Sequence, residues 1–450
     1  MKVIRYAMMV ALIAVAFAMS GATSPARAQS RTFSTGFQIQ NLSTSTANVT
    51  ISFYPEGSGT PLAPVPTTIP PGSSHTFATL PSAVTAGFSG AAVISADQKV
   101  AAIVNVVSPD LTLSFGGAAY SGFTAGAHTA SLPVVFKNYF NFNTFYNIQN
   151  VSSSPASVTV TYSNGATEGP FTIQPGSARR YDQSTLAGLP NNFFGSATVS
   201  SNQDVVATVI EVGPTTLLGY NAFTGGSTNP VFPLINTNNF GFQTGIGIQN
   251  TGASSTNVTV SYTPSAAGAA CTETQTIAAH SSAAFAINAF VSSVAGENCA
   301  NGATFVGSAK VTANSASMPL VAIVNQLNQT SNKGGSYDGF DTASATSKVV
   351  FPLIQDRFFG YFTGFSIMNV GSVATPIDCT FSGSAVHQTT ASLAPGASFT
   401  AQQLNAIANA YNGSGTCVAS AASAKIVGIA NQLKSAGTTD TFFVYEGTNN

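Results

Sequence analysis

The feature that most constrains the fold of this chain is a short segment that occurs four times. The copies span residues 36–54, 145–163, 245–263 and 364–382, and the first reads GFQIQNLSTSTANVTISFY. Each copy has an apolar-alternating run, an Asn, a small polar loop and a second alternating run. This pattern predicts two half-buried β-strands joined by a turn, which we interpret as a hairpin. A side-chain cap on the turn explains the recurring asparagines, which are Asn41, Asn150, Asn250 and Asn369.

The spacing of the copies predicts four domains. The asparagines lie 109, 100 and 119 residues apart, which is a domain of chain rather than a solenoid repeat. A Gly-led strand, a strongly apolar strand and a tyrosine marker follow each copy in the same order, and a Pro-Gly turn precedes them in every copy except the third, which has IAAHS at 277–281. About seven short strands in each period predict an all-β fold of four tandem immunoglobulin-like β-sandwich domains after a signal peptide. We expect a short helix only at residues 404–411.

The predicted division of the chain begins with an export signal. Lys2 and Arg5 precede an apolar run over residues 7–18, and Ala26-Arg27-Ala28 forms an A-x-A cleavage pattern. This order predicts a secretory signal peptide, with an uncleaved anchor as the less favoured alternative because the run is short for a membrane span. The expected segments are a signal peptide at 1–28 and β-sandwiches at 29–128, 129–227, 228–346 and 347–450.

Composition excludes several classes of partner. Removal of residues 1–28 takes three of the 14 basic side chains, so the remaining 11 accompany 15 acidic ones. This low charge argues against nucleic acid and against an anionic membrane surface, both of which require clustered Lys and Arg. Disorder is not expected either, because 44% of the residues are hydrophobic. We expect no insertion into a membrane after signal cleavage.

Four cysteines lie in the second half of the chain, and an even count in an exported protein predicts disulfides. Cys379 lies on the core face of its predicted strand, and Cys417 aligns with Ala92, Ala197 and Ala309 on another inward face. Cys299 follows Cys271 and lies in an insertion found only in the third copy. The expected pairs are Cys271–Cys299 and Cys379–Cys417.

The first copy lacks an element that the others have. An apolar strand precedes copies two, three and four, at residues 133–136, 230–234 and 349–353. We interpret it as a strand that opens the domain that follows. Copy one starts at Ser30-Arg-Thr-Phe33 without it, so its sheet is expected to have an open edge. Open edges accept strands from other chains, and we therefore expect copy one to accept a strand from a neighbour.

The titratable residues do not form a recognisable catalytic or metal-binding motif. The four histidines, at 75, 128, 280 and 387, have no metal-ligand spacing and are interpreted as surface or turn residues. Asp338 and Asp341 lie close in sequence, with Asp356 beyond them. They are interpreted as solvated loop acids, with a calcium site at the junction of copies three and four as the alternative. No cofactor, catalytic residue or metal ligand is assigned.

Aromatic stretches precede copies two, three and four. They are interpreted either as packing between neighbouring domains or as an exposed surface for assembly or glycan contact. The absence of Trp weakens the glycan interpretation. The candidate interface residues are Tyr139, Phe140, Phe142, Phe240, Phe242, Phe358, Phe359 and Tyr361.

The signatures G-F-x-I-Q-N, I-x-P-G-S and A-I-V-N over residues 31–447 resemble those of bacterial secreted proteins built from tandem β-sandwich repeats. That resemblance implies an extracellular or cell-surface protein and brings no catalytic residue with it. We expect a structural or adhesive protein, a rod of four sandwiches such as a subunit of a surface layer or fibre. Its partners are expected to be further copies, other surface proteins or glycans. The alternative is an array of carbohydrate-binding modules; an enzyme is not expected.

Overall fold

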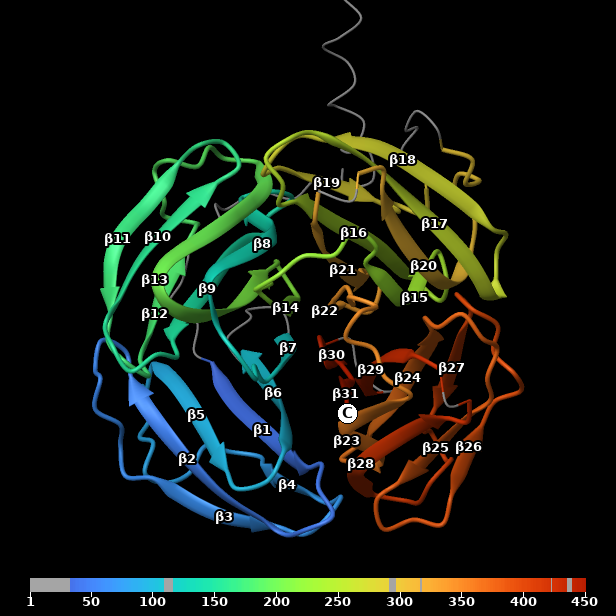
Figure 1. Ribbon diagram of the computed structural model, residues 1–450, viewed down its shortest axis with the longest axis horizontal. Helices are drawn as coiled ribbons and strands as arrows, with labels where there is room; N and C mark the ends of the chain where they lie inside the picture. The colour runs from blue at the N-terminus through green and yellow to red at the C-terminus, as the bar shows by residue number, and fades with distance from the viewer. Residues whose placement is uncertain (1–32, 109–115, 291–296, 316–317, 422, 435–438) are drawn as a thin grey trace, which may run out of the picture.

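The computed structural model describes residues 33–108, 116–290, 297–315, 318–421, 423–434 and 439–450. The predicted signal peptide lies outside these residues. The described chain is all-β and contains no helix (Figure 1). None of it therefore provides a helix long and apolar enough to cross a membrane.

The strands are grouped here into four units, named unit 1 to unit 4 in chain order. Unit 1 contains β1 (Ser34–Asn41), β2 (Ala47–Pro55), β3 (Val65–Ile69), β4 (Ser74–Phe77), β5 (Gly90–Ala96), β6 (Val100–Ser108) and β7 (Gly116–Ser121). Unit 2 contains β8 (Ala127–Lys137), β9 (Asn143–Asn150), β10 (Ala156–Tyr162), β11 (Thr167–Ile173), β12 (Ala178–Asp182), β13 (Phe193–Val212) and β14 (Leu217–Asn221).

Unit 3 contains β15 (Val231–Thr237), β16 (Phe242–Asn250), β17 (Thr256–Ala267), β18 (Cys271–Ile277), β19 (Ser282–Phe285), β20 (Phe305–Ala313), β21 (Leu320–Asn328) and β22 (Lys333–Asp338). Unit 4 contains β23 (Lys348–Phe358), β24 (Tyr361–Asn369), β25 (Ile377–Phe381), β26 (His387–Thr389), β27 (Ser398–Gln402), β28 (Tyr411–Ala419), β29 (Ile426–Lys434), β30 (Phe442–Glu446) and β31 (Thr448–Asn449).

The recurring segment forms two strands, but these strands do not pair with each other. In unit 1, β1 pairs with β4 and β6, whereas β2 pairs with β3 and β5 in a separate sheet. The predicted hairpin is therefore wrong, and the segment is an arch from one sheet to the facing one. Both strands have an apolar face, and each buries it by facing the other sheet across the core. On β2 the inward side chains Val49, Ile51 and Phe53 are at most 2% exposed.

The same pairings recur in the other units. The sheet of unit 3 that contains β22, which we call its inner sheet, has the order β19-β16-β21-β22. This order matches β4-β1-β6-β7, the inner sheet of unit 1. In unit 2 the Gly-led strand and the apolar strand are one element, the 20-residue β13, so its two sheets are continuous. The strands β8, β15 and β23 pair with β13, β20 and β28, respectively. Unit 1 has no described counterpart of these three opening strands.

The recurring asparagines cap the arches, as predicted. The Nδ2 group of Asn250 donates to the carbonyl oxygens of Ser254 (2.7 Å) and Ile277 (3.1 Å), and its Oδ1 accepts from the N–H of Gly252 (2.9 Å). Asn41, Asn150 and Asn369 make the equivalent bonds in their own units. The buried polar groups at the bend are thereby satisfied.

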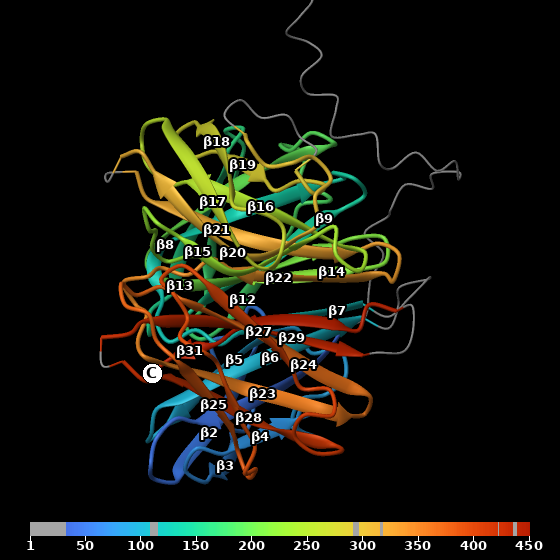
Figure 2. The ribbon, with the colours of Figure 1, turned by 90° about the vertical axis from the view of Figure 1, so that its right-hand side faces the viewer.

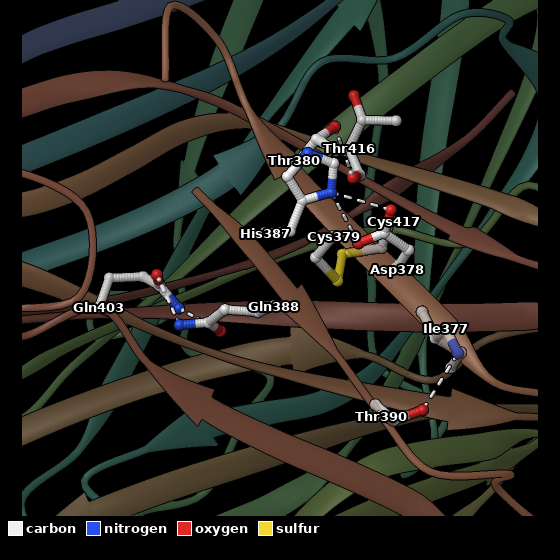
Figure 3. The surroundings of a disulfide bond; sticks show 10 residues. All are labelled: Ile377, Asp378, Cys379, Thr380, His387, Gln388, Thr390, Gln403, Thr416 and Cys417. Atoms are coloured by element: carbon white, nitrogen blue, oxygen red, sulfur yellow. Dashed lines mark hydrogen bonds and ion pairs between the residues drawn. A yellow bond between two sulfur atoms is a disulfide. The ribbon is translucent and has the colours of Figure 1, made fainter. Parts of the chain in front are cut away.

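Both predicted disulfides are present. Cys271 in β18 is bonded to Cys299, and Cys379 in β25 is bonded to Cys417 directly opposite it in β28 (Figure 3). The predicted alignment of Cys417 with Ala92 is wrong by two residues, because Ile94 is the residue that lies opposite Ile51 in unit 1. A shift of two keeps the side chain on the same face, so its inward orientation was predicted correctly. Disulfides are typical of oxidising compartments.

The residues 404–411 do not form the expected helix. Asn405 and Ala410 adopt positive φ angles of 60°, which a right-handed helix does not allow. The buried carboxyl group of Asp356 instead accepts backbone N–H groups of Asn405 (3.0 Å) and Ile407 (2.8 Å) and holds this segment as a loop.

The four units form a closed ring, so the expected rod is wrong (Figure 1). Unit 4 contacts unit 1 directly, for example through Asn105 Nδ2, which donates to Gln432 Oε1 at 3.2 Å. The strands β7, β14, β22 and β30, one from each unit, meet along the axis of the ring (Figures 1 and 2). Neighbouring cores also merge, since Ile323 of unit 3 lies in the core of unit 2.

Candidate functional site

The axial strands bring four equivalent polar residues together at one end of the ring axis. Each follows the recurring tyrosine, and they are Ser121, Asn221, Asp338 and Glu446. Ser121 Oγ donates to Glu446 Oε2 at 2.9 Å, and the N–H of Asp338 donates to Glu446 Oε1 at 2.6 Å. Asn221 Nδ2 donates to the carbonyl oxygen of Ser121 at 2.9 Å, and its N–H donates to Asp338 Oδ1 at 3.3 Å. All four units are thus connected at this point.

The two carboxyl groups at this end are hard to ionise together. Burial, and then the negative charge of Glu446, raise the pKa of Asp338 well above its usual range. Burial raises the pKa of Glu446, while hydrogen bonds from the Asp338 N–H and the Ser121 hydroxyl oppose the rise. The pair is therefore expected to retain a proton at pH values where isolated carboxyl groups have lost theirs.

A cavity of about 440 Å³ opens beside this cluster. It is lined by Asn221, Asp338, Asp341 and loops of units 1, 2 and 3. Asp341 is an exposed loop acid, as interpreted from the sequence, but Asp338 belongs to the axial cluster. Asp356 does not join them, because it holds the 404–411 loop. The described residues contain no group of three or more His, Cys, Asp or Glu side chains that could hold a metal ion.

A single carboxyl group closes the opposite end of the axis. Asp440, which precedes β30, accepts backbone N–H groups of Leu217 (2.7 Å), Gly334 (2.8 Å) and Gly117 (3.3 Å). These donors belong to units 2, 3 and 1, so one side chain of unit 4 is bonded to every other unit. Burial raises the pKa of Asp440 well above its usual range, and the three N–H groups and the Lys333 ammonium oppose the rise.

A further carboxyl group lies inside the ring, between units 2 and 3. Glu211 has no exposed surface, and its Oε2 accepts from Asn325 Nδ2 at 2.8 Å. Burial raises the pKa of Glu211 to about 8, with the Asn325 hydrogen bond acting against burial. Equivalent contacts between units 3 and 4 use amides instead, since Asn431 Nδ2 donates to Gln326 Oε1 at 3.3 Å.

The predicted aromatic interface lies in three equivalent loops, at residues 138–142, 238–242 and 357–361, which we call the aromatic loops. Each directly precedes or enters the first inner strand of its unit (β9, β16 or β24). These strands begin at the same end of the ring axis as the axial strands. Asp440 marks that end, because it is hydrogen-bonded to residues at the start of β7, β14 and β22. The aromatic loops therefore share one face of the ring, which we call the aromatic face. The C-terminus lies on the other face (Figure 2).

The aromatic residues divide into two groups. Phe240 and Phe359 are 93% and 79% exposed, and Phe140 is half-buried beside Tyr139. These three phenylalanines occupy the same place in their loops, with φ of 48°, 49° and 48° for residues 240, 359 and 140. The remaining members are half-buried and contact other rings: Phe142 and Tyr139 contact Phe136, Phe242 contacts Phe442 of unit 4, Tyr361 contacts Phe443, and Phe358 contacts the exposed Phe359.

The aromatic residues thus differ in their surroundings, and their exposure alone does not identify a partner. Phe242 packs between units, whereas Phe140, Phe240 and Phe359 reach the surface. A bulky residue at positive φ is strained, and such strain is commonly kept at functional positions. The geometry can present three apolar side chains together to a partner surface.

Sequence reasoning missed the axial cluster. The sequence shows the tyrosine marker at Tyr120, Tyr220, Tyr337 and Tyr445, but nothing in one unit indicates that the polar residues after these tyrosines meet. The sequence feature that indicates the cluster is a polar residue directly after the tyrosine in all four units, which is Ser, Asn, Asp or Glu. No protein-family model matches this chain, and no curated protein matches its sequence.

Proposed function

We propose that the protein is a non-catalytic extracellular structural or adhesive protein, built from four immunoglobulin-like β-sandwich domains that follow a cleaved signal peptide. The closed ring makes it a rigid block rather than a flexible string. The carboxyl groups of Asp440 and Glu211, which are buried, and of Asp338 and Glu446, which are half-buried, bond to other units, which is an architectural use of these groups. Two disulfides are consistent with a life outside the reducing cytoplasm.

The observation that carries this proposal is the aromatic face. Three phenylalanines occur at the same strained position, and two of them are almost fully exposed. A largely exposed Phe, such as Phe240, gains little from folding. A positive φ costs about 1–2 kcal/mol for a residue with a side chain. A surface for attachment or assembly accounts for both features, since partner binding buries the rings.

Substitution of the three phenylalanines by asparagine tests the proposal. Asn adopts positive φ more readily than Phe, so the triple variant Phe140→Asn, Phe240→Asn, Phe359→Asn is expected to keep or gain stability. It is also expected to lose self-association, measured by sedimentation velocity, and to lose binding to cell-envelope material. The matched control replaces exposed valines away from the aromatic face, Val151→Asn and Val418→Asn, and is expected to behave as the wild type.

A wild-type protein that neither associates with itself nor binds envelope material over a wide concentration range would contradict the proposal. Equal binding by the triple variant and the wild type would contradict the role of the aromatic face. The carbohydrate-module alternative expects aromatic rings on an exposed sheet face. The exposed positions of β2 and β17 instead include Asn48, Thr50, Asn257 and Thr263 and carry no aromatic ring, although the half-buried Tyr54 lies on the same face of β2.

A further inference from the structure

Among its described residues, unit 1 has no counterpart of the strand that completes each of the other units. In units 2, 3 and 4 the opening strands β8, β15 and β23 pair with β13, β20 and β28. The equivalent strand of unit 1 is β5, and among the described residues it pairs with β2 alone. One edge of β5 therefore presents its backbone N–H and C=O groups without a strand partner in the part of the chain that the structure describes.

Core positions next to this edge are uncovered. Ala92 of β5 is exposed and Ile94 is half-buried, whereas their counterparts Ala197 and Val199 of unit 2 are at most 1% exposed. The pairing registers establish this equivalence, because Ala92 lies opposite Phe53 as Ala197 lies opposite Tyr162. The missing strand thus leaves part of the apolar interior of unit 1 accessible.

The facing sheet of unit 1 shows the same deficiency. Ala102 and Val104 of β6 are half-buried, and their counterparts Ala207 and Val209 of β13 are at most 1% exposed. An extended segment placed beside β5 would cover residues of both sheets, as β8 does in unit 2.

Two further groups in unit 1 are equivalent to groups that bond to the opening strand in other units. The hydroxyl groups of Tyr220, Tyr337 and Tyr445 donate to carbonyl oxygens in the opening strands of their units. Tyr120 stands at the same place opposite Val104, and no such carbonyl faces it among the described residues. The backbone of Phe223 pairs with Ser131 of β8 in both directions, and Phe123 is the corresponding residue of unit 1.

The chain's own sequence is poorly suited to fill the edge. Asn41 and Asn150 are equivalent, and counting back equally from each makes residues 22–28 the counterpart of residues 131–137. The segment in unit 2 reads SLPVVFK, whereas its counterpart reads ATSPARA. This counterpart precedes the predicted cleavage site and offers no large apolar side chain. The three suitable strands of a second copy are already paired within their own units.

We propose that the open edge of β5 binds an extended apolar strand of a different exported polypeptide. The occupant is a segment of about seven residues rich in Val, Leu and Phe, because β8, β15 and β23 define what the equivalent place accepts. The segment pairs with β5 through backbone hydrogen bonds and covers Ile94 and Val104. One of its carbonyl oxygens accepts a hydrogen bond from the Tyr120 hydroxyl. This site is separate from the aromatic face and does not depend on it.

A peptide titration tests this proposal on the protein from Gln29 to Asn450. The probe is a fluorescent peptide with the sequence of residues 130–138, and a scrambled peptide is the reference. We expect saturable one-to-one binding in fluorescence anisotropy and a rise in Tm for the first peptide alone. No difference between the two peptides would overturn the proposal.

A self-complemented variant locates the binding. It carries a second copy of residues 129–142 joined directly to Ser34, as these residues are joined to Asn143 in unit 2. We expect it to bind the peptide at least tenfold more weakly than the wild type. The matched control has the same insertion with Asp in place of the copied Leu132, Val134 and Phe136, and it is expected to bind as the wild type does. Undiminished binding by the self-complemented variant would place the peptide elsewhere. Dimers of the wild type that this variant abolishes would assign the edge to a second copy and refute a different partner.

Discussion

Glu211 is a residue whose acid–base chemistry departs clearly from its ordinary state. It is fully buried between units 2 and 3, with one hydrogen bond from Asn325 and no partner for Oε1 among the described residues. Its pKa rises from 4.5 to about 8 on folding because burial disfavours the charged form. The folded protein therefore holds a proton between about pH 4.5 and 8 that the unfolded chain releases.

This proton makes stability depend on pH. The contribution of Glu211 is fully present below pH 4.5 and is lost as the pH rises through about 8. The Glu211→Gln side chain stays neutral and still accepts a hydrogen bond from Asn325. We therefore expect the free energy of unfolding of this variant to fall by a few kcal/mol less than that of the wild type between pH 5 and pH 8. The size follows from about 1.4 kcal/mol for each unit of pKa difference. Urea unfolding at the two pH values measures this difference. A variant with the same pH dependence as the wild type would show that Glu211 is ionised in the fold. Some dependence remains in either case, because Asp338, Glu446 and Asp440 also have raised pKa values.

Residues whose role is local were predictable from the sequence, and those whose role depends on the ring were not. Cys379 and Cys417 lie on apolar faces that strand alternation reveals, so their pairing follows from one unit alone. Asp440 lies in no motif. Its three partners come from three other units, and only the closed arrangement brings them together.

At the scale of elements, the arch decides the architecture of each unit. The alternating runs predicted the strands and their buried faces correctly, but a period of two is the same for strands that pair and strands that face each other. The asparagine cap is the feature that distinguishes an arch between two sheets from a hairpin. Its side chain bonds to the strand end of the other sheet, as Asn250 does to Ile277, and so directs the chain across the core.

The cap is therefore expected to be a large local contributor to stability. We predict that Asn250→Ala lowers the free energy of unfolding by about 2–4 kcal/mol, because three carbonyl groups and one N–H at a buried bend lose their partner. Asn250→Asp keeps the acceptor for the Gly252 N–H but not the donors, so its loss should be at least as large, with a negative charge added beside three carbonyl oxygens. Denaturant unfolding monitored by circular dichroism measures both variants. If Asn250→Ala cost no more than an ordinary surface substitution, about 0.5 kcal/mol, the arch would be held by its flanking strands alone.

At the scale of the whole molecule, the ring is closed by polar contacts near its axis as well as by merged cores. Three recurring serines add to these contacts on the outer side: Ser196, Ser308 and Ser414 donate to the turn carbonyls of His280, Gly396 and Gly72 in the next unit. Ala91 is the counterpart in unit 1 and has no hydroxyl to donate. In the part of the chain that the structure describes, the junction between units 1 and 2 thus has neither this bond nor an opening strand, which distinguishes it from the other junctions of the ring.

Asp440 offers the most direct test of closure. We predict that Asp440→Ala lowers the free energy of unfolding by several kcal/mol, because it leaves the N–H groups of Gly117, Leu217 and Gly334 buried without an acceptor, at about 1–3 kcal/mol each. Hydrogen exchange followed by mass spectrometry should show faster exchange in three segments, one in each of units 1, 2 and 3, although the substitution lies in unit 4. The control, Asp378→Ala, removes a half-exposed acid of unit 4 that pairs with His387 and should change stability by less than about 0.5 kcal/mol. Faster exchange confined to unit 4 would show that the other units hold together without this carboxyl group. Faster exchange in all three distant segments would establish that one side chain couples the four units into a single cooperative structure.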